Sequence, residues 1–436
     1  MVAQNLARAL IEARAVRPYT IPSMRVGGLG LISGATLVLF GVGGLRQIFS
    51  VWVRPIEADF GADRATVAGI AALSYLMFGL GQPFLGRLVD LGGPRLVVPG
   101  AVLAAGLGAL LAPLTAALWQ FGLVFVLLTS VGYAGAANAT IAAAVMQRFE
   151  RRRGLIFGLC SAGAPLGQLI LAPVAAVSID GFGWRPTMAG FGVALLLVVL
   201  PAAWMLLART PAPKRASGPG LLTTLRLAFR RRAFVLLFGS YFLCGLTTLG
   251  VVHTHLVPYA VDVGVSAVAG ARVLGLVGLF DVIGLIVAGQ AADRWGGRLP
   301  LVVAFTVRAL SLLWLATATD ERALVLFALV FGLTDMATIP LVAAASAEIF
   351  GPRMIGALMG ILVVAHQIGS ATGSYLAGVG YELLGSYPTV MLASAGLSLC
   401  AALLSLNLEA RNEEQGMRNE GPACCCGPRT VSGSSR

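Results

Sequence analysis

The feature that most constrains this chain is a series of long apolar runs separated by short polar segments. An α-helix needs about 20 mostly apolar residues to cross the hydrocarbon core of a membrane. Runs of that length fall at 26–52, 66–87, 96–117, 120–147, 154–177, 185–208, 234–259, 266–291, 299–318, 322–348, 354–380 and 387–408. They are apolar throughout rather than alternating, which argues against an outer-membrane barrel. The sequence therefore predicts an all-α membrane protein with twelve transmembrane helices.

The composition excludes most other classes. Only 11% of the residues are charged and 58% are hydrophobic, whereas a soluble domain carries about 25% charged residues. Of the six cysteines, three lie in apolar runs and three adjoin one another at 424–426, so neither a disulfide framework nor a zinc-ligand spacing is present. We expect these last three to be reduced in a cytoplasmic tail, with palmitoylation or adventitious metal as the alternatives.

The net charge of +12 is explained by the distribution of arginines across the membrane. Cytoplasmic loops of membrane proteins carry an excess of Lys and Arg. With the N-terminus inside, the outer segments contain only Arg54, Arg64, Arg185 and Arg322. The first 23 residues also lack the apolar core and cleavage site of a signal peptide. We predict a multi-pass protein of the cell or inner membrane with both termini cytoplasmic and no nucleic-acid partner.

The chain divides into two similar halves. The stretch from Gly86 to Arg95 recurs from Gly289 to Arg298, with Gly, Asp, Gly and Arg each displaced by 203 positions. Duplicated halves are typical of secondary transporters, whose binding site lies between the halves near the membrane midplane. We therefore expect a cytoplasmic N-terminal segment (1–25), an N-terminal six-helix bundle (26–208), a cytoplasmic linker (209–233), a C-terminal six-helix bundle (234–408) and a disordered cytoplasmic tail (409–436).

The repeated stretch resembles the loop motif of the major facilitator superfamily, G-x-x-x-D-x-x-G-x-[RK], which occurs between helices 2 and 3 and again between helices 8 and 9. The resemblance implies two pseudo-symmetric six-helix bundles and a cytoplasmic gate that holds the outward-facing state. The matching gate residues are Arg87, Asp90, Arg95, Asp293, Arg294 and Arg298. Simple neutralisation of charge at the helix ends is the alternative interpretation.

Within the superfamily, several short stretches are similar to the monocarboxylate porters and the oxalate/formate antiporters. They include Arg46-Gln47 in helix 1, His255-Leu-Val-Pro258 in helix 7 and His366-Gln367 in helix 11. The chain departs from that branch in helix 8, where Asp281 is followed one turn later by Leu285 instead of an arginine. The resemblance implies a small organic anion as substrate, without naming it.

Ionisable side chains inside a membrane are costly, so each one is a candidate for function. The candidates for substrate binding are Arg46, Gln47, Tyr133, Asn138, His255, His366 and Gln367, and the candidates for proton coupling are Asp281 and Asp335. We expect Arg308 to form an intramembrane ion pair with one of these two acids. The alternatives are snorkelling of Arg46 to the headgroups, structural pairing of the acids and helix-to-helix hydrogen bonding by Tyr133 and Asn138.

These features predict a secondary active transporter rather than an enzyme, with no cofactor, acting as a monomer in the lipid bilayer. The single lysine, Lys214, does not form the Gly-Lys-[Ser/Thr] sequence of a phosphate-binding loop, so an ion or solute gradient supplies the energy. The predicted cargo is a small organic anion of the monocarboxylate class, coupled to protons or to a counter-anion. The alternatives are proton-driven efflux of a hydrophobic or cationic compound, and a non-transporting receptor or scaffold.

Overall fold

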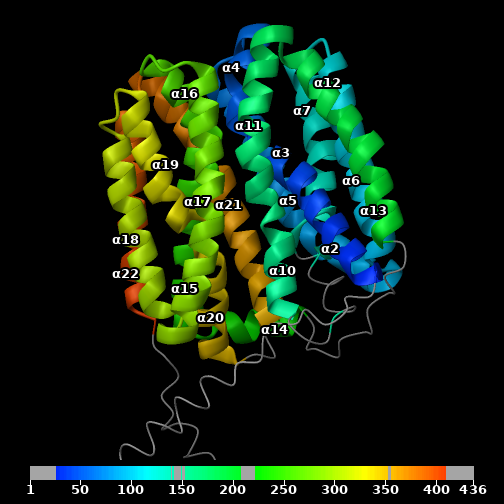
Figure 1. Ribbon diagram of the computed structural model, residues 1–436. Helices are drawn as coiled ribbons and strands as arrows, with labels where there is room; N and C mark the ends of the chain where they lie inside the picture. Colours follow the sequence, from blue (N-terminus) through cyan, green and yellow to red (C-terminus); the bar gives the residue numbers. More distant parts are fainter. Residues whose placement is uncertain are drawn as a thin grey trace, which may run out of the picture.

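The computed structural model describes residues 26–138, 140–141, 149, 153–207, 221–351 and 355–408. Within these ranges the chain forms helices and connecting turns but no strand, and the helices stand side by side as long columns (Figure 1). Eleven helical segments are long and apolar enough to cross a membrane. Helix α21 (Ile355–Leu384), with 30 residues, has the length for a twelfth. The predicted all-α fold with twelve spans is confirmed.

The N-terminal half contains six columns, several of them interrupted by π-helical turns. Their elements are, in order: α2 (Val26–Val38), η1 (Leu39–Gly43), α3 (Gly44–Gln47) and α4 (Phe49–Phe60); α5 (Arg64–Gly92); α6 (Pro94–Leu111) and η2 (Ala112–Leu114); α7 (Leu118–Val124), η3 (Phe125–Thr129) and α8 (Ser130–Gly135); α10 (Arg153–Ser161) and α11 (Gly163–Phe182); α12 (Trp184–Ala194), η4 (Leu195–Val199) and α13 (Leu200–Leu207).

The C-terminal half contains the other six columns: α15 (Arg232–Gly245), η5 (Leu246–Val252) and α16 (His253–Asp262); α17 (Ala267–Trp295); α18 (Arg298–Leu315); α19 (Glu321–Asp335) and α20 (Thr338–Phe350); α21; and α22 (Pro388–Leu406). A short helix, α14 (Leu221–Phe229), precedes them in the predicted linker and packs against α15 and α21. The predicted N-terminal segment, the tail and residues 208–220 lie outside the described residues.

Both copies of the repeated stretch end a long helix with the same turn. Helix α5 ends at Gly93, with φ 78°, and α17 ends at Gly296, with φ 73°. Backbone with positive φ is readily adopted only by glycine, so the second glycine of the motif is required by the turn itself. The sequence repeat therefore corresponds to a repeated local structure.

Large apolar side chains cover the outside of the columns. Leu103, Trp119, Leu197, Trp204 and Leu310 are all more than 40% exposed, and they belong to four different columns. Soluble monomers rarely expose apolar surface on this scale. The surface is suited to contact with lipid tails, and the protein is a multi-pass membrane protein.

The two halves touch at one end of the molecule and are separated at the other. We call the end at which α14 lies the linker end. In α5, a Cβ placed on Gly79 would overlap the Cβ of Gln367 in the other half. Gly86 lies seven residues closer to the linker end, on nearly the same face of the helix, and a Cβ placed there would meet nothing. Along α17, Gly275 lies against Leu169 of α11, whereas Gly289 has open space. The structure is therefore open between the halves at the linker end and closed at the opposite end.

Glycines also allow close packing within a half, which gives a first prediction. A Cβ at Gly369 of α21 would overlap the main-chain oxygen of Phe242 in α15, whereas a Cβ at Gly360 of the same helix meets nothing. Overpacking costs about 1–3 kcal/mol. We expect Gly369→Ala to lower the melting temperature of the purified protein by several degrees and Gly360→Ala to leave it unchanged or raise it. Equal melting temperatures would contradict this packing of α21 on α15.

Candidate functional site

The polar groups in the middle of the molecule lie at irregularities in three helices. The first column breaks at Ile48, where φ is −102° and ψ is 20°, directly after Gln47. The seventh passes through the π-helical turn η5 immediately before His253. The tenth breaks between α19 and α20, directly after Asp335. Such interruptions release main-chain polar groups and are common at functional sites of transporters.

His253 connects these three breaks. Its ring Nε2 lies 2.7 Å from Oδ2 of Asp335, and its ring Nδ1 lies 3.3 Å from the main-chain oxygen of Gln47. The ring is fully buried. His253 and Asp335 lie 82 positions apart in the chain, and no spacing in the sequence indicates that they pair. His253 therefore joins the C-terminal half to the N-terminal half at the centre of the molecule.

Arg308 in α18 supports the break in the tenth column. Its guanidinium group donates to the main-chain oxygen of Thr334, to that of Asp335 at 3.2 Å and to Sγ of Cys244 at 3.0 Å. The carbonyls at the end of a helix lack intrahelical partners, and the arginine satisfies two of them. This arrangement differs from the expected ion pair, because the carboxylate of Asp335 binds His253 instead.

Asp281 in α17 lies beside the same break. Its Oδ1 accepts a hydrogen bond from the main-chain N–H of Met336 at 3.3 Å. Its Oδ2 is buried and has no hydrogen-bond partner in the part of the chain that the structure describes. An unpaired carboxylate is unfavourable in such a place, so this oxygen is suited to hold a proton or to meet a ligand.

Arg46 in α3 presents an unpaired positive group on the other side of the centre. Its guanidinium carbon lies 4.3 Å from the centroid of the Phe78 ring. Its Nη1 atom is buried without a hydrogen-bond partner among the described residues, and so is Oε1 of the adjacent Gln47. No carboxylate of the described residues forms an ion pair with Arg46, so its Nη1 atom is available to an anion.

The remaining predicted polar residues contribute neutral groups. Oε1 of Gln367 and Oδ1 of Asn138 are buried and unpartnered in the described ranges. The His366 ring lies against the Tyr241 ring in a tilted arrangement, with centroids 4.7 Å apart. Tyr133 lines a small cavity of about 20 Å³ in the N-terminal half, together with Phe125.

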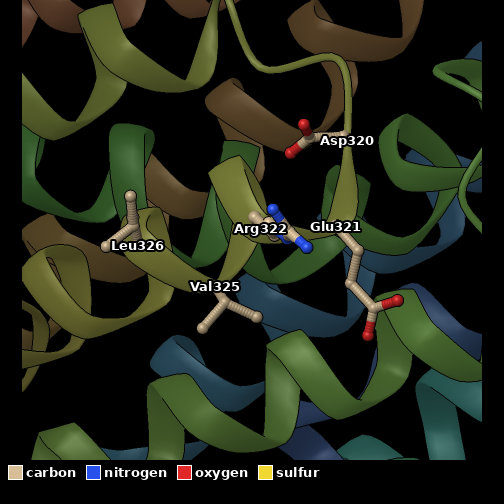
Figure 2. A pocket seen from close by; sticks show the side chains of 5 residues that line it. All are labelled: Asp320, Glu321, Arg322, Val325 and Leu326. Carbon is tan, nitrogen blue, oxygen red and sulfur yellow. The ribbon is translucent and has the colours of Figure 1, made fainter.

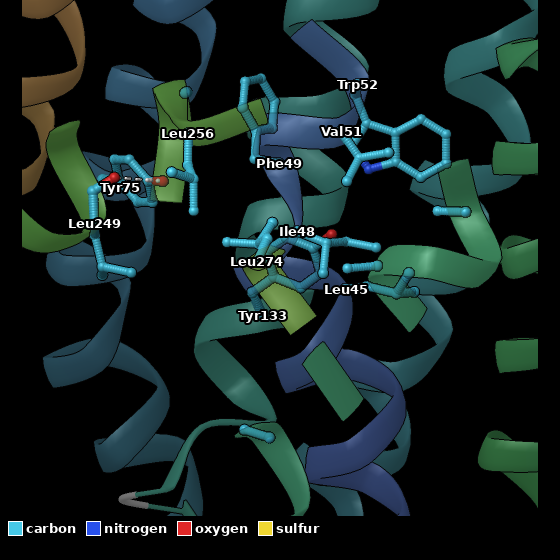
Figure 3. Close-up of a cluster of buried hydrophobic side chains, with 14 of the residues drawn as sticks. Leu45, Ile48, Phe49, Val51, Trp52, Tyr75, Tyr133, Leu249, Leu256 and Leu274 are labelled. Atoms are coloured by element: carbon cyan, nitrogen blue, oxygen red, sulfur yellow. Dashed lines mark hydrogen bonds between the residues drawn. The ribbon is translucent and has the colours of Figure 1, made fainter. Parts of the chain in front are cut away.

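Apolar side chains from both halves surround this centre. Figure 3 shows Leu45, Ile48 and Tyr75 of the N-terminal half close to Leu249 and Leu274 of the C-terminal half, and all five belong to one buried cluster. The hydroxyl of Tyr75 donates to the main-chain oxygen of Leu249 at 3.2 Å. The low polarity of the surroundings strengthens any charge interaction made by the central polar groups.

His255 lies away from the centre, in contrast to its expected place among the substrate-binding residues. Its Nδ1 is 2.8 Å from the Tyr387 hydroxyl, and its Nε2 is 2.9 Å from the main-chain oxygen of Ser374. Both partners lie toward the closed end. The spacing of two residues points the rings of His253 and His255 in different directions, as expected for a helix.

The closed end is held by a cluster of charged groups that we call the Arg64 seal. Arg64 of α5 binds Glu57 of α4 at 2.8 Å and, across the two halves, Asp262 at 2.7 Å and the Tyr387 hydroxyl at 3.2 Å. Its main-chain N–H donates to Glu382 at 2.9 Å. The Arg64 side chain is only 3% exposed, so these contacts are shielded from water. The seal ties the two halves together at this end.

Removing the arginine from the seal should open it. Arg64→Gln leaves Glu57 without its salt-bridge partner and leaves Asp262 with only the more exposed Arg54, at 3.6 Å. Breaking a buried charge pair costs about 3 kcal/mol. We expect faster hydrogen exchange in α4 and α16. Arg185→Gln is a matched control, because Arg185 binds Asp59 within the N-terminal half only and is more exposed. Similar exchange in the two variants would contradict a role of the seal in closure.

The predicted gate residues lie at the linker end. Arg87, Arg95, Asp293 and Arg294 are exposed, and Arg294 lies 5.2 Å from the Trp295 ring. Arg298, also exposed, donates to the main-chain oxygen of Leu406. The side chain of Asp90 lies outside the described residues. The predicted gate is expected to hold the halves together only in the outward-facing state, and the linker end is open here. The role of these residues as a gate remains a prediction.

A surface hollow lies at the start of α19 and is unrelated to these groups. Figure 2 shows its lining, Asp320, Glu321, Arg322, Val325 and Leu326, which all come from one short stretch of chain. Asp320 already caps α19 by accepting from the N–H of Ala323 at 2.8 Å. The hollow is open and is formed by one segment, so it carries no argument for a binding site.

Comparison with known proteins identifies the family. The family model of the Major Facilitator Superfamily matches residues 35–307 and 256–423, which together cover most of the chain. The protein belongs to the major facilitator superfamily. Its resemblance to this superfamily, expected from the paired loop motifs, is thereby confirmed, and it is a transporter rather than an enzyme.

Individual members of the superfamily are related to the chain over most of their length. An uncharacterised MFS-type transporter, YcxA of Bacillus subtilis, is 27% identical over 379 residues, which are 84% of this chain and 91% of that protein. Monocarboxylate transporter 13 of Rattus norvegicus is 26% identical over 365 residues, which are 82% of this chain and 83% of that protein. The inward-open structure of the xylose transporter XylE from E. coli superposes with a TM-score of 0.68 at 16% identity, covering 88% of this chain and 97% of that one.

Proposed function

We propose that this major facilitator protein moves a small organic anion of the monocarboxylate class across the cytoplasmic membrane by alternating access. Transport is coupled to protons or to a counter-anion. The linker end faces the cytoplasm, so that the conformation described here is open to the inside. This orientation agrees with the excess of arginines that the sequence places on that side.

The observation that carries the proposal is the buried, unpartnered Nη1 atom of Arg46. A buried cation is costly without a partner, and the cost is offset when an anion binds. Nη1 of Arg46 is buried and has no hydrogen-bond partner among the described residues, and the same holds for Oε1 of the adjacent Gln47. A carboxylate fits the planar fork of an arginine with two hydrogen bonds. The neutral groups of Asn138, His366 and Gln367 would then contact the rest of the substrate.

Proton coupling rests on the two acids at the break in the tenth column. Asp335 binds an imidazole, and Oδ2 of Asp281 has no hydrogen-bond partner within the described ranges. Both are fully or almost fully buried. Protonation of either group removes a negative charge from an apolar environment. Anion exchange is the alternative form of coupling.

The relatives support the substrate class. Monocarboxylate transporters of several vertebrates match the chain at 25–26% identity. At this identity the particular substrate is open, and Leu285 stands where the animal monocarboxylate porters carry an arginine. In this chain the anion-binding charge comes from helix 1 instead of helix 8.

One observation favours the second candidate, proton-driven efflux of a cationic compound. The free Oδ2 of Asp281 is a buried oxygen with no arginine as ion-pair partner in the described residues, and a lipophilic cation would fill that role. Arg46 argues against this second candidate, because its positive charge repels a cation from the same space.

A substrate screen with the purified full chain in liposomes separates the two functions. Radiolabelled lactate, pyruvate, oxalate and formate are tested against tetraphenylphosphonium, each with and without an inward proton gradient. Uptake of a carboxylate above that of protein-free liposomes supports the proposal. Movement of the phosphonium alone would replace it with cation efflux, and flux of neither class would favour a non-transporting role.

A further inference from the structure

The protons of the His253–Asp335 pair can be counted from its two hydrogen bonds. A main-chain carbonyl oxygen only accepts hydrogen bonds, so the ring Nδ1 of His253, 3.3 Å from the oxygen of Gln47, must carry a hydrogen. The other ring nitrogen, Nε2, lies 2.7 Å from Oδ2 of Asp335, and that contact also needs one hydrogen between the two atoms. The pair therefore holds two hydrogens on its three polar contact atoms.

Two arrangements satisfy this count. In one, His253 is an imidazolium ion and Asp335 a carboxylate. In the other, His253 is neutral with its hydrogen on Nδ1, and Asp335 is a carboxylic acid that donates to Nε2. Both contain the same number of protons, and both carry no net charge. The bare pair with one proton fewer has a net charge of −1 in a fully buried position.

We infer that the His253–Asp335 pair is the carrier of the coupled proton, and that its contact with Gln47 reports whether the proton is bound. This inference rests on the proposed function. When the pair releases one proton, the single hydrogen left on the ring moves to Nε2, where it donates to the Asp335 carboxylate. Nδ1 then presents a lone pair to the Gln47 oxygen, and the hydrogen bond between the halves is lost.

Other charged and titratable groups surround the pair on every packed element. Arg308 of α18 donates to the main-chain oxygen of Asp335. Asp281 of α17 accepts from the main-chain N–H of Met336, the next residue. His366 of α21 lies near enough to interact electrostatically, as does Tyr241 of α15. Among the described residues, only His253 both contacts the Asp335 carboxylate directly and contacts the opposite half, at the Gln47 oxygen.

The contact with Gln47 places the proton next to the proposed anion site. Gln47 follows Arg46 directly, and α3 ends at this residue, before the break at Ile48. A broken helix moves more readily than a continuous one, because fewer hydrogen bonds hold its two parts in line. Loss of the His253 bond therefore releases the segment that carries the anion-binding arginine. Proton release and anion release are thereby linked through one main-chain oxygen.

The tautomer of His253 can be measured without any substrate. The chain contains three histidines, so the full-length protein labelled with ¹⁵N in histidine gives three ring systems, and His253→Gln assigns the one of interest. We expect Nδ1 of His253 to be protonated at low pH and unprotonated at high pH in lipid nanodiscs, with Nε2 protonated at high pH. Nδ1 unprotonated across the whole range from acid to alkaline would overturn the inference, and so would Nδ1 protonated throughout.

Two variants sharpen the result. In Asp335→Asn the side-chain amide donates to Nε2, so the ring should keep its hydrogen on Nδ1 at every pH. Asp281→Asn is the matched control and should retain the switch. A switch that persists unchanged in Asp335→Asn would refute the pair as its origin. If that variant does not fold, the titration of the unmodified protein decides alone.

The outcome is distinguishable from that of the substrate screen. A tautomer switch together with no carboxylate uptake would leave the proton pair in place and remove the proposed anion. Carboxylate uptake driven by a proton gradient, without the switch, would retain the proposed function and remove His253 from it.

Discussion

Replacing Arg46 with Gln should abolish binding of the transported anion while leaving the protein folded. The guanidinium Nη1 has no partner to lose within the described residues, so the substitution strands no buried acid. Each hydrogen bond to a charged group contributes about 1.5–3 kcal/mol, and a carboxylate held by two of them should bind about 100-fold or more weakly in the variant. Binding is measured with the carboxylate that the screen identifies, on the purified protein.

A second arginine within a membrane-spanning segment serves as the control. Arg272 of α17 is exposed on the outside of its helix, and Arg272→Gln removes the same charge without touching the centre. The affinity of the Arg272→Gln variant for the anion should stay within a few-fold of that of the original protein. Arg46→Gln binding the anion equally well would show that the anion site lies elsewhere and that Arg46 has a different role.

The Asp335→Asn variant should stop proton-driven accumulation while exchange of substrate across the membrane continues. Asparagine has nearly the shape of aspartate but binds no proton at neutral pH, and exchange needs no net release of a proton. Accumulation under an inward proton gradient should fall to the level set by simple equilibration. Counterflow of labelled substrate into liposomes loaded with unlabelled substrate should remain within a few-fold. Both assays are run on the same preparation.

The same pair of assays applied to Asp281→Asn separates the two acids. If Asp281 carries the proton instead, that variant loses accumulation and Asp335→Asn keeps it. Accumulation at the original level in both variants would leave proton coupling without a carboxylate carrier. In that case we would assign proton binding to His366, or conclude that the protein exchanges anions instead of carrying an anion together with a proton.

The membrane spans and the repeated turns could be predicted because each follows from a local requirement. Lipid tails demand about 20 apolar residues in every crossing helix, and this demand is visible in any window of the sequence. Gly93 and Gly296 could be matched because the motif is contiguous and the turn needs a residue without a Cβ. Neither inference needed knowledge of which helices pack together.

The partners of the buried polar groups depended on features that the sequence does not display. The pairing of His253 with Asp335 requires the π-helical turn at Leu246–Val252, which changes the face that the following residues present. The carbonyls that bind Arg308 become available only because the tenth column breaks after Asp335. A pattern of apolar residues predicts a helix but not its interruption, so Arg308 was expected to bind a carboxylate.

The glycines that face open space at the linker end have a consequence for how this protein tolerates mutation. Under the proposed alternating access, the surfaces around Gly86 and Gly289 approach their neighbours only after the substrate site has opened to the other side of the membrane. The Cβ atom of a residue that replaced either glycine would meet nothing in the conformation described here. Screens that score yield or heat resistance would pass such variants as harmless, whereas selection for growth on the transported nutrient would reject them. Positions that differ between these two kinds of screen would map the surfaces used only in the other half of the transport cycle.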